Sequence, residues 1–453
     1  MTYREHIAKN FTLAFPVMLS QLGHVMVGVA DSVMVGQLGT VELAAVSLGG
    51  APFHLIMLFG IGISFGITPL VAAADGNENA NRINILLKHA LVVDFIVGIL
   101  LSLLLIVAAP YLGIIGQEAE VLDYAIPYIN IVSLSLIPLM VFQAFRQFVE
   151  GLSMTKQAMY ISISANVINV ILNYLLIYGA LGFPELGLNG AAWATFISRV
   201  LMAVGMGVFV FRSRRLQIYT KGLGLVKLSM RPVKSLLQIG VPSGLQFIFE
   251  AGAFAMATVM IGWLGAEALA AHQIALNLAG ITYMTASGIS AAATIRVGNQ
   301  FGKGDFSTMR LAGFSCFLMV GIFMAVCALA FMLGREFLPN LYVDDAEVIA
   351  IVAQLMIIAA IFQISDGIQV VGLGALRGLS DVKVPTMVTA LAFWVLAIPL
   401  GYLLGFVLDY GAFGVWIGLL LGLSVAGLLH LIRFNHKSNS LLSGSKSPVL
   451  SKV

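Results

Sequence analysis

The sequence has few cysteines and few charged residues, and it lacks the short motifs that bind ATP or catalytic zinc. Its two cysteines, Cys316 and Cys327, lie eleven residues apart in one apolar run, too far apart on a helix to form a disulfide. No Walker P-loop and no H-E-x-x-H motif occurs, which argues against ATP as the energy source and against a zinc hydrolase. Charged residues make up only 10% of the chain, which excludes an ordinary soluble domain.

The chain is instead dominated by long apolar runs, since 60% of its residues are hydrophobic. A helix needs ~20 predominantly apolar residues to cross a bilayer, and twelve runs reach that length. The sequence therefore predicts an all-α polytopic membrane protein with spans near residues 11–38, 47–74, 84–110, 122–148, 157–181, 188–211, 236–264, 272–300, 308–334, 347–376, 382–407 and 411–434.

Lysine and arginine are distributed on one side of these spans. They occur in or directly beside the N-terminus, the connections after even-numbered spans and the C-terminal tail, with Arg199 and Arg335 as exceptions. The connections after odd-numbered spans are acidic or neutral. The positive-inside rule therefore predicts that both termini are cytoplasmic.

The two halves of the chain are related to each other with an offset of 226 residues. Pro242 corresponds to Pro16, and the VMIGWLG run that ends at Gly265 corresponds to the VMVGQLG run that ends at Gly39. Six spans per half give both halves the same orientation, as in transporters whose two bundles rock around a site at the membrane midplane. We expect an N-lobe at 1–211, a linker at 212–235, a C-lobe at 236–434 and a disordered cytoplasmic tail at 435–453.

Two acidic residues lie near the middle of spans in the second half. Glu250 lies in the proline-containing span, and Asp366 lies in the sequence IFQISDGIQ. A charge at that depth costs about 2.5–3.5 kcal/mol on insertion scales, so such residues usually face a cavity or a partner. A structural pair that shares one proton is the alternative, but we favour a site that binds a coupling cation.

A second candidate site lies in the first half. Asp31, Asn169, Asn173 and Thr195 come from three spans and are expected at a similar depth. Their carboxylate, amide and hydroxyl oxygens suit a hard cation such as Na⁺. The alternative is a polar network that only holds helices together. Asp94, the fourth acid within a span, could simply pair locally.

Four stretches of the sequence carry a resemblance to a known family. They read VADSVMVGQLG, FEAGAFAMATVMIGWLGAEALAAHQIA, RVGNQFGKGD and FQISDGIQVVGLGALRG. With these stretches the whole chain resembles a NorM-type member of the MATE family of multidrug and toxic-compound extruders. The resemblance implies two pseudo-symmetric six-helix bundles that alternate between outward- and inward-facing forms in the bacterial inner membrane.

The resemblance also implies a function and a set of site residues. The function is export of small organic cations in exchange for Na⁺ or H⁺, with no cofactor, no nucleic acid and no enzymatic reaction, by a monomer in the lipid bilayer. The family's cation-site acids fall on Asp31, Glu250 and Asp366. Sodium-coupled relatives are expected to have a tyrosine one turn before the last of these, where this sequence has Phe362. That departure makes proton coupling at Glu250 more plausible.

Three other functions remain as alternatives. A flippase for lipid-linked sugars shares the architecture, but its cavity needs several basic residues to bind diphosphate, and Arg199 is the one basic residue expected deep within a span. A membrane-embedded enzyme needs a nucleophile with its base, or a metal cluster, and the sequence suggests neither. A channel would be excluded by a saturable flux coupled to an ion gradient.

Overall fold

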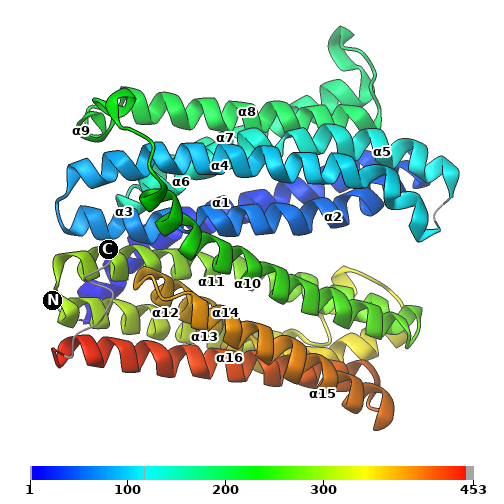
Figure 1. The fold of residues 1–453 in the computed structure, drawn as a ribbon. Helices are drawn as coiled ribbons and strands as arrows, with labels where there is room; N and C mark the ends of the chain where they lie inside the picture. Colours follow the sequence, from blue (N-terminus) through cyan, green and yellow to red (C-terminus); the bar gives the residue numbers. More distant parts are fainter. Residues whose placement is uncertain (1–2, 117, 445–453) are drawn as a thin grey trace. The chain divides into compact units, whose positions relative to one another are not determined.

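The computed structural model of the protein describes residues 3–116 and 118–444. Within those residues every regular element is helical (Figure 1). Twelve of the described helical stretches are long and apolar enough to cross a membrane. The predicted fold class and number of spans are therefore confirmed, and the chain is a multi-pass membrane protein.

The first half of the chain forms six of these spans, some of them divided into consecutive helices. The elements are α1 (Tyr3–Gly36), α2 (Thr40–Ser64), α3 (Ile67–Gly76), α4 (Ala80–Ala108), η1 (Ala109–Ile115), α5 (Ala119–Leu134), α6 (Leu136–Gly151), α7 (Thr155–Tyr178), η2 (Ala180–Gly182) and α8 (Leu188–Arg212).

The second half repeats this order after a short connection. The elements are α9 (Gln217–Thr220), η3 (Leu223–Leu225), α10 (Met230–Gly262), α11 (Ala266–Lys303), α12 (Phe306–Gly334), η4 (Leu338–Leu341), α13 (Ala346–Gly378), α14 (Lys383–Ala390), η5 (Leu391–Ala397), α15 (Ile398–Tyr402), η6 (Leu403–Val407) and α16 (Gly411–Leu442). The eleventh span differs from the others because η5 and η6 are π-helical turns on either side of α15.

Two helix N-caps are related by the same 226-residue offset as the sequence repeat. Asn79 caps the start of α4 by accepting a hydrogen bond from the backbone N–H of Arg82 at 3.0 Å. Asp305, which lies 226 residues later, caps α12 by accepting from the N–H of Thr308 at 3.0 Å. A side-chain oxygen at this position satisfies one of the free N–H groups of the first helical turn. The duplication therefore extends from the sequence to hydrogen-bond geometry.

By contacts the chain divides into one unit of residues Leu19–Gly244 and one of Met1–Met18 with Leu245–Val453. Both divisions fall two residues after the prolines inside α1 and α10, Pro16 and Pro242. This grouping differs from the expected lobes at 1–211 and 236–434. The first part of each proline-containing helix groups with the other repeat.

Close backbone contacts at glycines explain why the first parts of α1 and α10 group with the other repeat. A Cβ atom on Gly62 of α2 would lie 2.7 Å from the backbone nitrogen of Gly244 in α10. The repeat-related Gly288 of α11 approaches Met18 of α1 in the same way, since a Cβ there would lie 3.0 Å from the Met18 nitrogen. Each contact lies inside one unit. Glycine at these positions lets the two backbones approach as in other membrane helix pairs.

Two helices extend beyond the boundaries expected from the sequence. The predicted disordered tail begins at residue 435, but α16 continues as a helix to Leu442, and only residues 445–453 of that tail lie outside the described residues. Arg310 of α12 holds this extension by donating to Ser438 Oγ at 2.9 Å and Asn435 Oδ1 at 2.7 Å. The predicted linker at 212–235 is also shorter, because α10 begins at Met230 with a polar turn that an apolar-run criterion does not detect.

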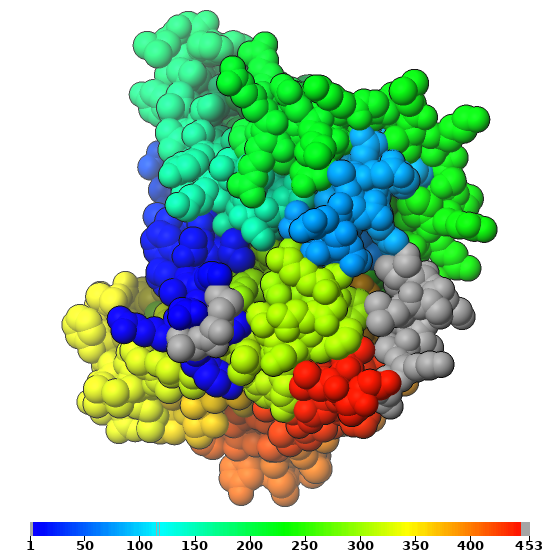
Figure 2. Space-filling view, turned by 90° about the vertical axis from the view of Figure 1, so that its left-hand side faces the viewer, coloured from blue at the N-terminus to red at the C-terminus, as the bar shows by residue number. Residues whose placement is uncertain are grey.

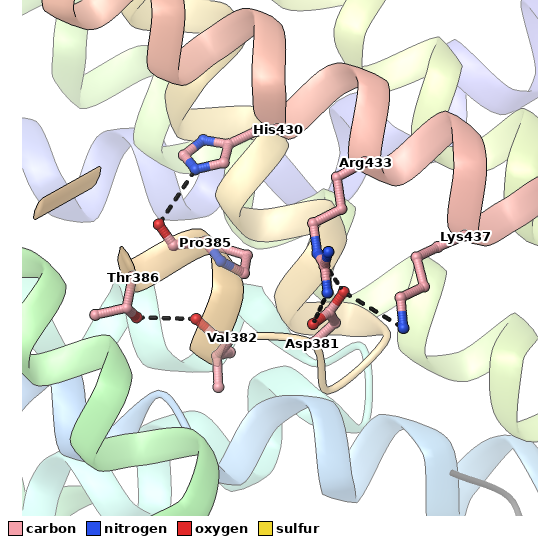
Figure 3. Close-up of polar contacts among 7 residues, drawn as sticks. All are labelled: Asp381, Val382, Pro385, Thr386, His430, Arg433 and Lys437. Atoms are coloured by element: carbon pink, nitrogen blue, oxygen red, sulfur yellow. Dashed lines mark hydrogen bonds and ion pairs between the residues drawn. The ribbon is translucent and has the colours of Figure 1, made fainter. Parts of the chain in front are cut away.

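A cluster of ion pairs holds the other side of the same extension. Arg433 of α16 donates two hydrogen bonds to the carboxylate of Asp381, at 2.8 and 2.9 Å, and Lys437 lies 3.8 Å from it (Figure 3). The His430 ring nitrogen Nε2 lies 3.4 Å from the Pro385 carbonyl oxygen in the same view. These contacts fix α16 against the α13–α14 turn, which explains why the polar end of the chain stays helical to Leu442.

Candidate functional site

Glu250 and Asp366 come together inside the unit that contains Leu245–Val453. Glu250 lies on α10 and is 8% exposed, and Asp366 lies on α13 and is 4% exposed. They are close enough for their charges to interact. The structure therefore brings together the two acids that their depth in the spans had singled out, although the sequence alone did not show that they were neighbours.

Polar side chains from a third helix and from α13 surround the two acids. The Tyr283 side chain of α11 is near both carboxylates. Gln369, three residues after Asp366 and so on the same face of α13, approaches Glu250. The Gln369 amide nitrogen faces the Glu250 carboxylate, and within the described residues the amide oxygen Oε1 lacks a hydrogen-bond partner. Buried polar groups are usually paired, so an unpaired amide oxygen beside two acids marks a place for a bound ion or water.

Hydrogen bonds also join residues that neighbour these groups along their helices. Thr282, adjacent to Tyr283, donates to Gln363 Oε1 at 2.6 Å, and Gln363 lies three residues before Asp366. On α10, Gln246 lies one turn before Glu250 and donates to Thr389 Oγ1 at 3.5 Å. These residues were missed by the sequence reasoning. Their signal was a glutamine three or four residues from each buried acid.

No basic residue neutralises this pair in the described structure. The ion pairs within residues 3–116 and 118–444 include those of Arg146 with Glu150, of Arg335 with Glu336, and of Arg433 and Lys437 with Asp381. No basic residue in that part of the chain is among the charges that act on Glu250 or Asp366. Two buried carboxylates without a fixed countercharge repel each other and favour an incoming cation or proton.

Phe362 lies one turn before Asp366 and belongs to an aromatic cluster. Its ring is 3% exposed, with its centroid 6.1 Å from that of Phe254 and 5.7 Å from that of Trp416. The indole N–H of Trp416 in turn donates to His272 Nδ1 at 3.1 Å. Sodium-coupled relatives are expected to have a tyrosine at this position. Here the position holds a phenylalanine that packs against apolar side chains and offers no oxygen.

The first-half candidates lie in the unit of residues Leu19–Gly244, and three of them are joined. The amide of Asn173 on α7 donates a hydrogen bond to the carboxylate of Asp31 on α1. It also donates to Asn169 Oδ1 at 3.3 Å, and both asparagines are buried. The Asn173 carbonyl oxygen Oδ1 has no partner among the described residues, so it could take part in binding a cation.

Thr195 is not brought into that group by a hydrogen bond. It lies on α8 and is half-buried, and among the described residues no hydrogen bond joins its hydroxyl to Asp31. One turn further along α8, Arg199 interacts electrostatically with Asp31. The sequence had identified Arg199 as an exception within a span but had not paired it with an acid.

Arg199 is held by groups that carry no formal charge. Its guanidinium donates to Ser135 Oγ at 2.7 Å and to Met57 Sδ at 3.3 Å, and it lies over the Phe53 ring, 5.2 Å from the centroid. Asp31 is therefore its electrostatic counterpart. A positive charge beside Asp31 opposes binding of a second cation, so the first-half site differs electrostatically from the Glu250–Asp366 pair.

Asp94 lies apart from both groups. It is on α4, 1% exposed, and the Ser64 hydroxyl lies beside its carboxyl. Within the part of the chain that the structure describes, no group of three or more His, Cys, Asp or Glu side chains is arranged to hold a metal ion. Any Na⁺ bound here would thus depend on amide, hydroxyl and carboxylate oxygens together.

A family model described as MatE matches the chain twice, over residues 16–175 and 242–403. The chain belongs to the MatE family. The two matched segments begin at Pro16 and Pro242, which are the repeat-related prolines of α1 and α10. The family model therefore recognises the same duplication that the sequence and the helix caps show.

Relatives of this MatE chain extend over nearly its whole length. It is 33% identical to the multidrug resistance protein NorM of Photobacterium profundum, over 95% of each chain. It is 35% identical to the probable multidrug resistance protein NorM of Idiomarina loihiensis, over 94% of this chain and 93% of the relative. The predicted family is confirmed.

Solved structures support the fold. The outward-facing form of a multidrug resistance MATE family transporter of the MOP superfamily aligns with a TM-score of 0.89 at 19% identity, covering 97% of each chain. At that identity the likeness concerns the fold. Together with membership of this transporter family, it confirms the expectation of a transporter rather than an enzyme.

Proposed function

We propose that this MatE chain exports small organic cations in exchange for Na⁺ or H⁺, with Glu250 and Asp366 as the principal coupling residues. The observation that supports this proposal is their burial side by side without a basic partner in the described residues. Its relatives are named multidrug resistance proteins, which agrees with export of varied compounds.

The coupling step follows from charge. A proton or Na⁺ that reaches the pair removes the repulsion between two buried carboxylates, and the unpartnered oxygen of the Gln369 amide could bind Na⁺. A cationic substrate would compete for the same negative charge. Binding of the ion and of the substrate is then mutually exclusive, which is the condition for exchange.

The absence of an oxygen at Phe362 bears on the choice of ion. A Na⁺ site without that ligand is less complete, whereas a proton needs only the carboxylates. Proton coupling at Glu250 is therefore the form of the proposal that this structure favours.

We place Asp31, Asn169, Asn173 and Thr195 in a supporting role. The positive charge of Arg199 acts on Asp31, so this group is less suited to hold a permanent extra cation than to change partners during the transport cycle. The carboxylate can exchange its interaction with Arg199 for one with a transient cation, which would link the first unit to the ion gradient.

The proposed orientation places both termini in the cytoplasm of a bacterial cell, with the chain in the inner membrane as a monomer. The basic connections after even-numbered spans support this orientation. The membrane potential would supply about 2.3 kcal/mol per elementary charge per 100 mV. Exchange of one monovalent drug for one ion gains nothing from the potential, so the ion gradient or a second ion must drive export.

Uptake of a fluorescent cation into inverted vesicles tests the proposal. An imposed pH gradient should drive uptake by the wild-type protein more strongly than an imposed Na⁺ gradient of the same size. Vesicles without the protein give the background. Equal uptake with and without both gradients would contradict coupled exchange and would favour a channel.

A further inference from the structure

A cavity of ≈ 600 Å³ lies between the start of α4 and the connection from α9 to α10, far from both groups of acids in sequence. All of its lining residues belong to the unit Leu19–Gly244. Figure 2 shows the green connection beside the light-blue start of α4 on one face of this unit. Nothing in the proposed exchange of cations uses this cavity.

Side chains of α4 hold the connection in place. Asn84 Nδ2 donates to the Tyr219 carbonyl at 2.7 Å, and Lys88 Nζ donates to the Val226 carbonyl at 2.5 Å. The backbone N–H of Ser229 donates to a ring nitrogen of His89 at 3.0 Å. These contacts come from neighbouring turns of one helix. The cavity is therefore preorganised and is not a gap beneath a loose loop.

Three positive side chains line the cavity: Lys221, Lys227 and Arg231. None of them forms an ion pair with a carboxylate within residues 3–116 and 118–444. Like charges gathered around one space raise the local positive potential, which attracts an anion. A phosphate group, which accepts hydrogen bonds from several cations at once, matches this lining.

One buried acceptor also lines the cavity. Asn84 is 7% exposed, and its amide nitrogen donates to the Tyr219 and Lys221 carbonyls, which fixes Oδ1 as the free end. Oδ1 has no hydrogen-bond partner in the described structure. A buried acceptor of this kind needs a donor. The cavity thus offers cations for an anion and an acceptor for a hydroxyl of the same ligand.

Apolar side chains around the cavity indicate that the ligand is a lipid. Ile218 and Leu225 line the cavity and are 64% and 87% exposed, and Met230 at the start of α10 is 77% exposed. The connection joins two helices that are long and apolar enough to span a membrane, so we expect these side chains near the membrane surface. Mixed basic and apolar side chains at that level are typical of segments that bind anionic lipids.

We propose that this cavity binds the headgroup of an anionic glycerophospholipid of the phosphatidylglycerol type. Lys221, Lys227 and Arg231 contact the phosphate, and a glycerol hydroxyl donates to Asn84 Oδ1. The acyl chains leave along Ile218 and Leu225 toward the bilayer.

Native mass spectrometry of the purified, delipidated protein tests this site with four probes: phosphatidylglycerol, phosphatidylmethanol, phosphatidylcholine and free glycerol 3-phosphate. The wild-type protein should retain phosphatidylglycerol most strongly and phosphatidylcholine least. The triple variant Lys221→Gln/Lys227→Gln/Arg231→Gln should bind phosphatidylglycerol about 100-fold more weakly, since each of the three cations near a lipid surface contributes roughly fivefold.

The matched control removes the same charge from the end of α8 and the residues that follow it, which do not line the cavity. Arg212→Gln/Arg214→Gln/Arg215→Gln should change phosphatidylglycerol binding by less than about threefold. An equal loss in both triple variants would show general surface attraction and would overturn the site. Displacement of the lipid by equimolar glycerol 3-phosphate would assign the cavity to a soluble phosphate instead. Equal binding of phosphatidylmethanol would contradict the role of Asn84.

A second measurement needs no variant and so does not depend on whether the triple variants fold. A phosphatidylglycerol with a photoreactive group near the headgroup should label peptides that contain residues 80–85 or 218–232 of the wild-type protein. Labelling confined to other peptides would refute the assignment.

Discussion

Asn173 donates a hydrogen bond to the carboxylate of Asp31 and so joins α7 to α1, while Arg199 interacts with the same carboxylate from α8. Asp31 thus accepts a hydrogen bond from a neutral donor and lies within the influence of a cation, although no ion pair joins it to Arg199 in the described structure. No basic residue among the described ones acts in this way on Glu250 or Asp366. The two halves share an ancestor in sequence, but they offer an incoming ion two different electrostatic environments.

The interaction of Arg199 with Asp31 predicts non-additive effects on stability. Arg199→Gln leaves Asp31 without its cation, and Asp31→Asn leaves the guanidinium without its acid. The double variant should lose less stability than the sum of the single variants, with a coupling of about 0.5–3 kcal/mol. Thermal unfolding in detergent measures this, and a cycle of Asp31→Asn with Arg212→Gln serves as the control. Additive losses in both cycles would mean that Arg199 and Asp31 are not coupled.

A tyrosine at position 362 should change the choice of ion. Phe362→Tyr places a hydroxyl one turn before Asp366 and adds the oxygen that the pair lacks. We expect stimulation of efflux by Na⁺ to rise at least about threefold, against little change for Phe393→Tyr in the same aromatic cluster. Efflux in vesicles with and without Na⁺ measures the effect. Identical Na⁺ dependence in wild type and Phe362→Tyr would count against a cation site at this pair.

The repeat-related caps should differ in their response to pH. The hydrogen bond from the Thr308 backbone holds the pKa of Asp305 below its usual range. The stabilisation by this cap is therefore fully present at pH values above the ordinary aspartate pKa of ~4. It is lost as the pH falls through the lowered pKa of Asp305 in the folded protein. Asp305→Ala should cost about 1 kcal/mol at pH 7 and less in acid.

Asn79 provides the matched control because its amide does not titrate. Asn79→Ala should destabilise α4 by a similar amount at every pH. Thermal unfolding in detergent between pH 7 and pH 3 compares the two variants. A pH-independent effect of Asp305→Ala would show that the carboxylate form is not what caps α12.

The glycines at which α2 approaches α10 and α11 approaches α1 should not tolerate an added methyl group. Gly62→Ala places Cβ against the Gly244 backbone, which cannot rotate away, and overpacking of this kind costs about 1–3 kcal/mol. Gly280→Ala on α11 is the control, since no heavy atom lies within 4 Å of its added Cβ. Detergent melting temperatures should fall for Gly62→Ala alone. A wild-type melting temperature for Gly62→Ala would show that α2 and α10 are not in close contact.

The sequence predicted those features that repeat or that depend on hydropathy. The 226-residue offset and the apolar runs predicted twelve spans in two related halves, and depth within a span singled out Glu250, Asp366 and Asp31. Hydropathy does not report polar turns beyond an apolar run. It therefore placed the starts of α1 and α10 too late and treated the helical residues 435–442 as disordered.

Contacts between helices were predicted less well, because depth does not determine the direction in which a side chain points. Asn173 does contact Asp31, but Thr195 at a similar depth forms no hydrogen bond with it in the described structure. The proximity of Arg199 to Asp31 and of Tyr283 to the second pair depends on helix rotation. The first part of α1 likewise packs against α11 through a glycine contact, and the sequence alone does not show which helices meet at that glycine.

The proposed ion exchange depends most on Glu250 and Asp366. Efflux of a fluorescent cation from energised vesicles tests their coupling role directly. Glu250→Gln and Asp366→Asn should each reduce gradient-driven efflux to background while the protein still reaches the membrane in normal amounts. Glu267→Gln, which neutralises an exposed acid at the start of α11, should leave efflux unchanged. Wild-type efflux from either buried-site variant would contradict the coupling role proposed for the pair.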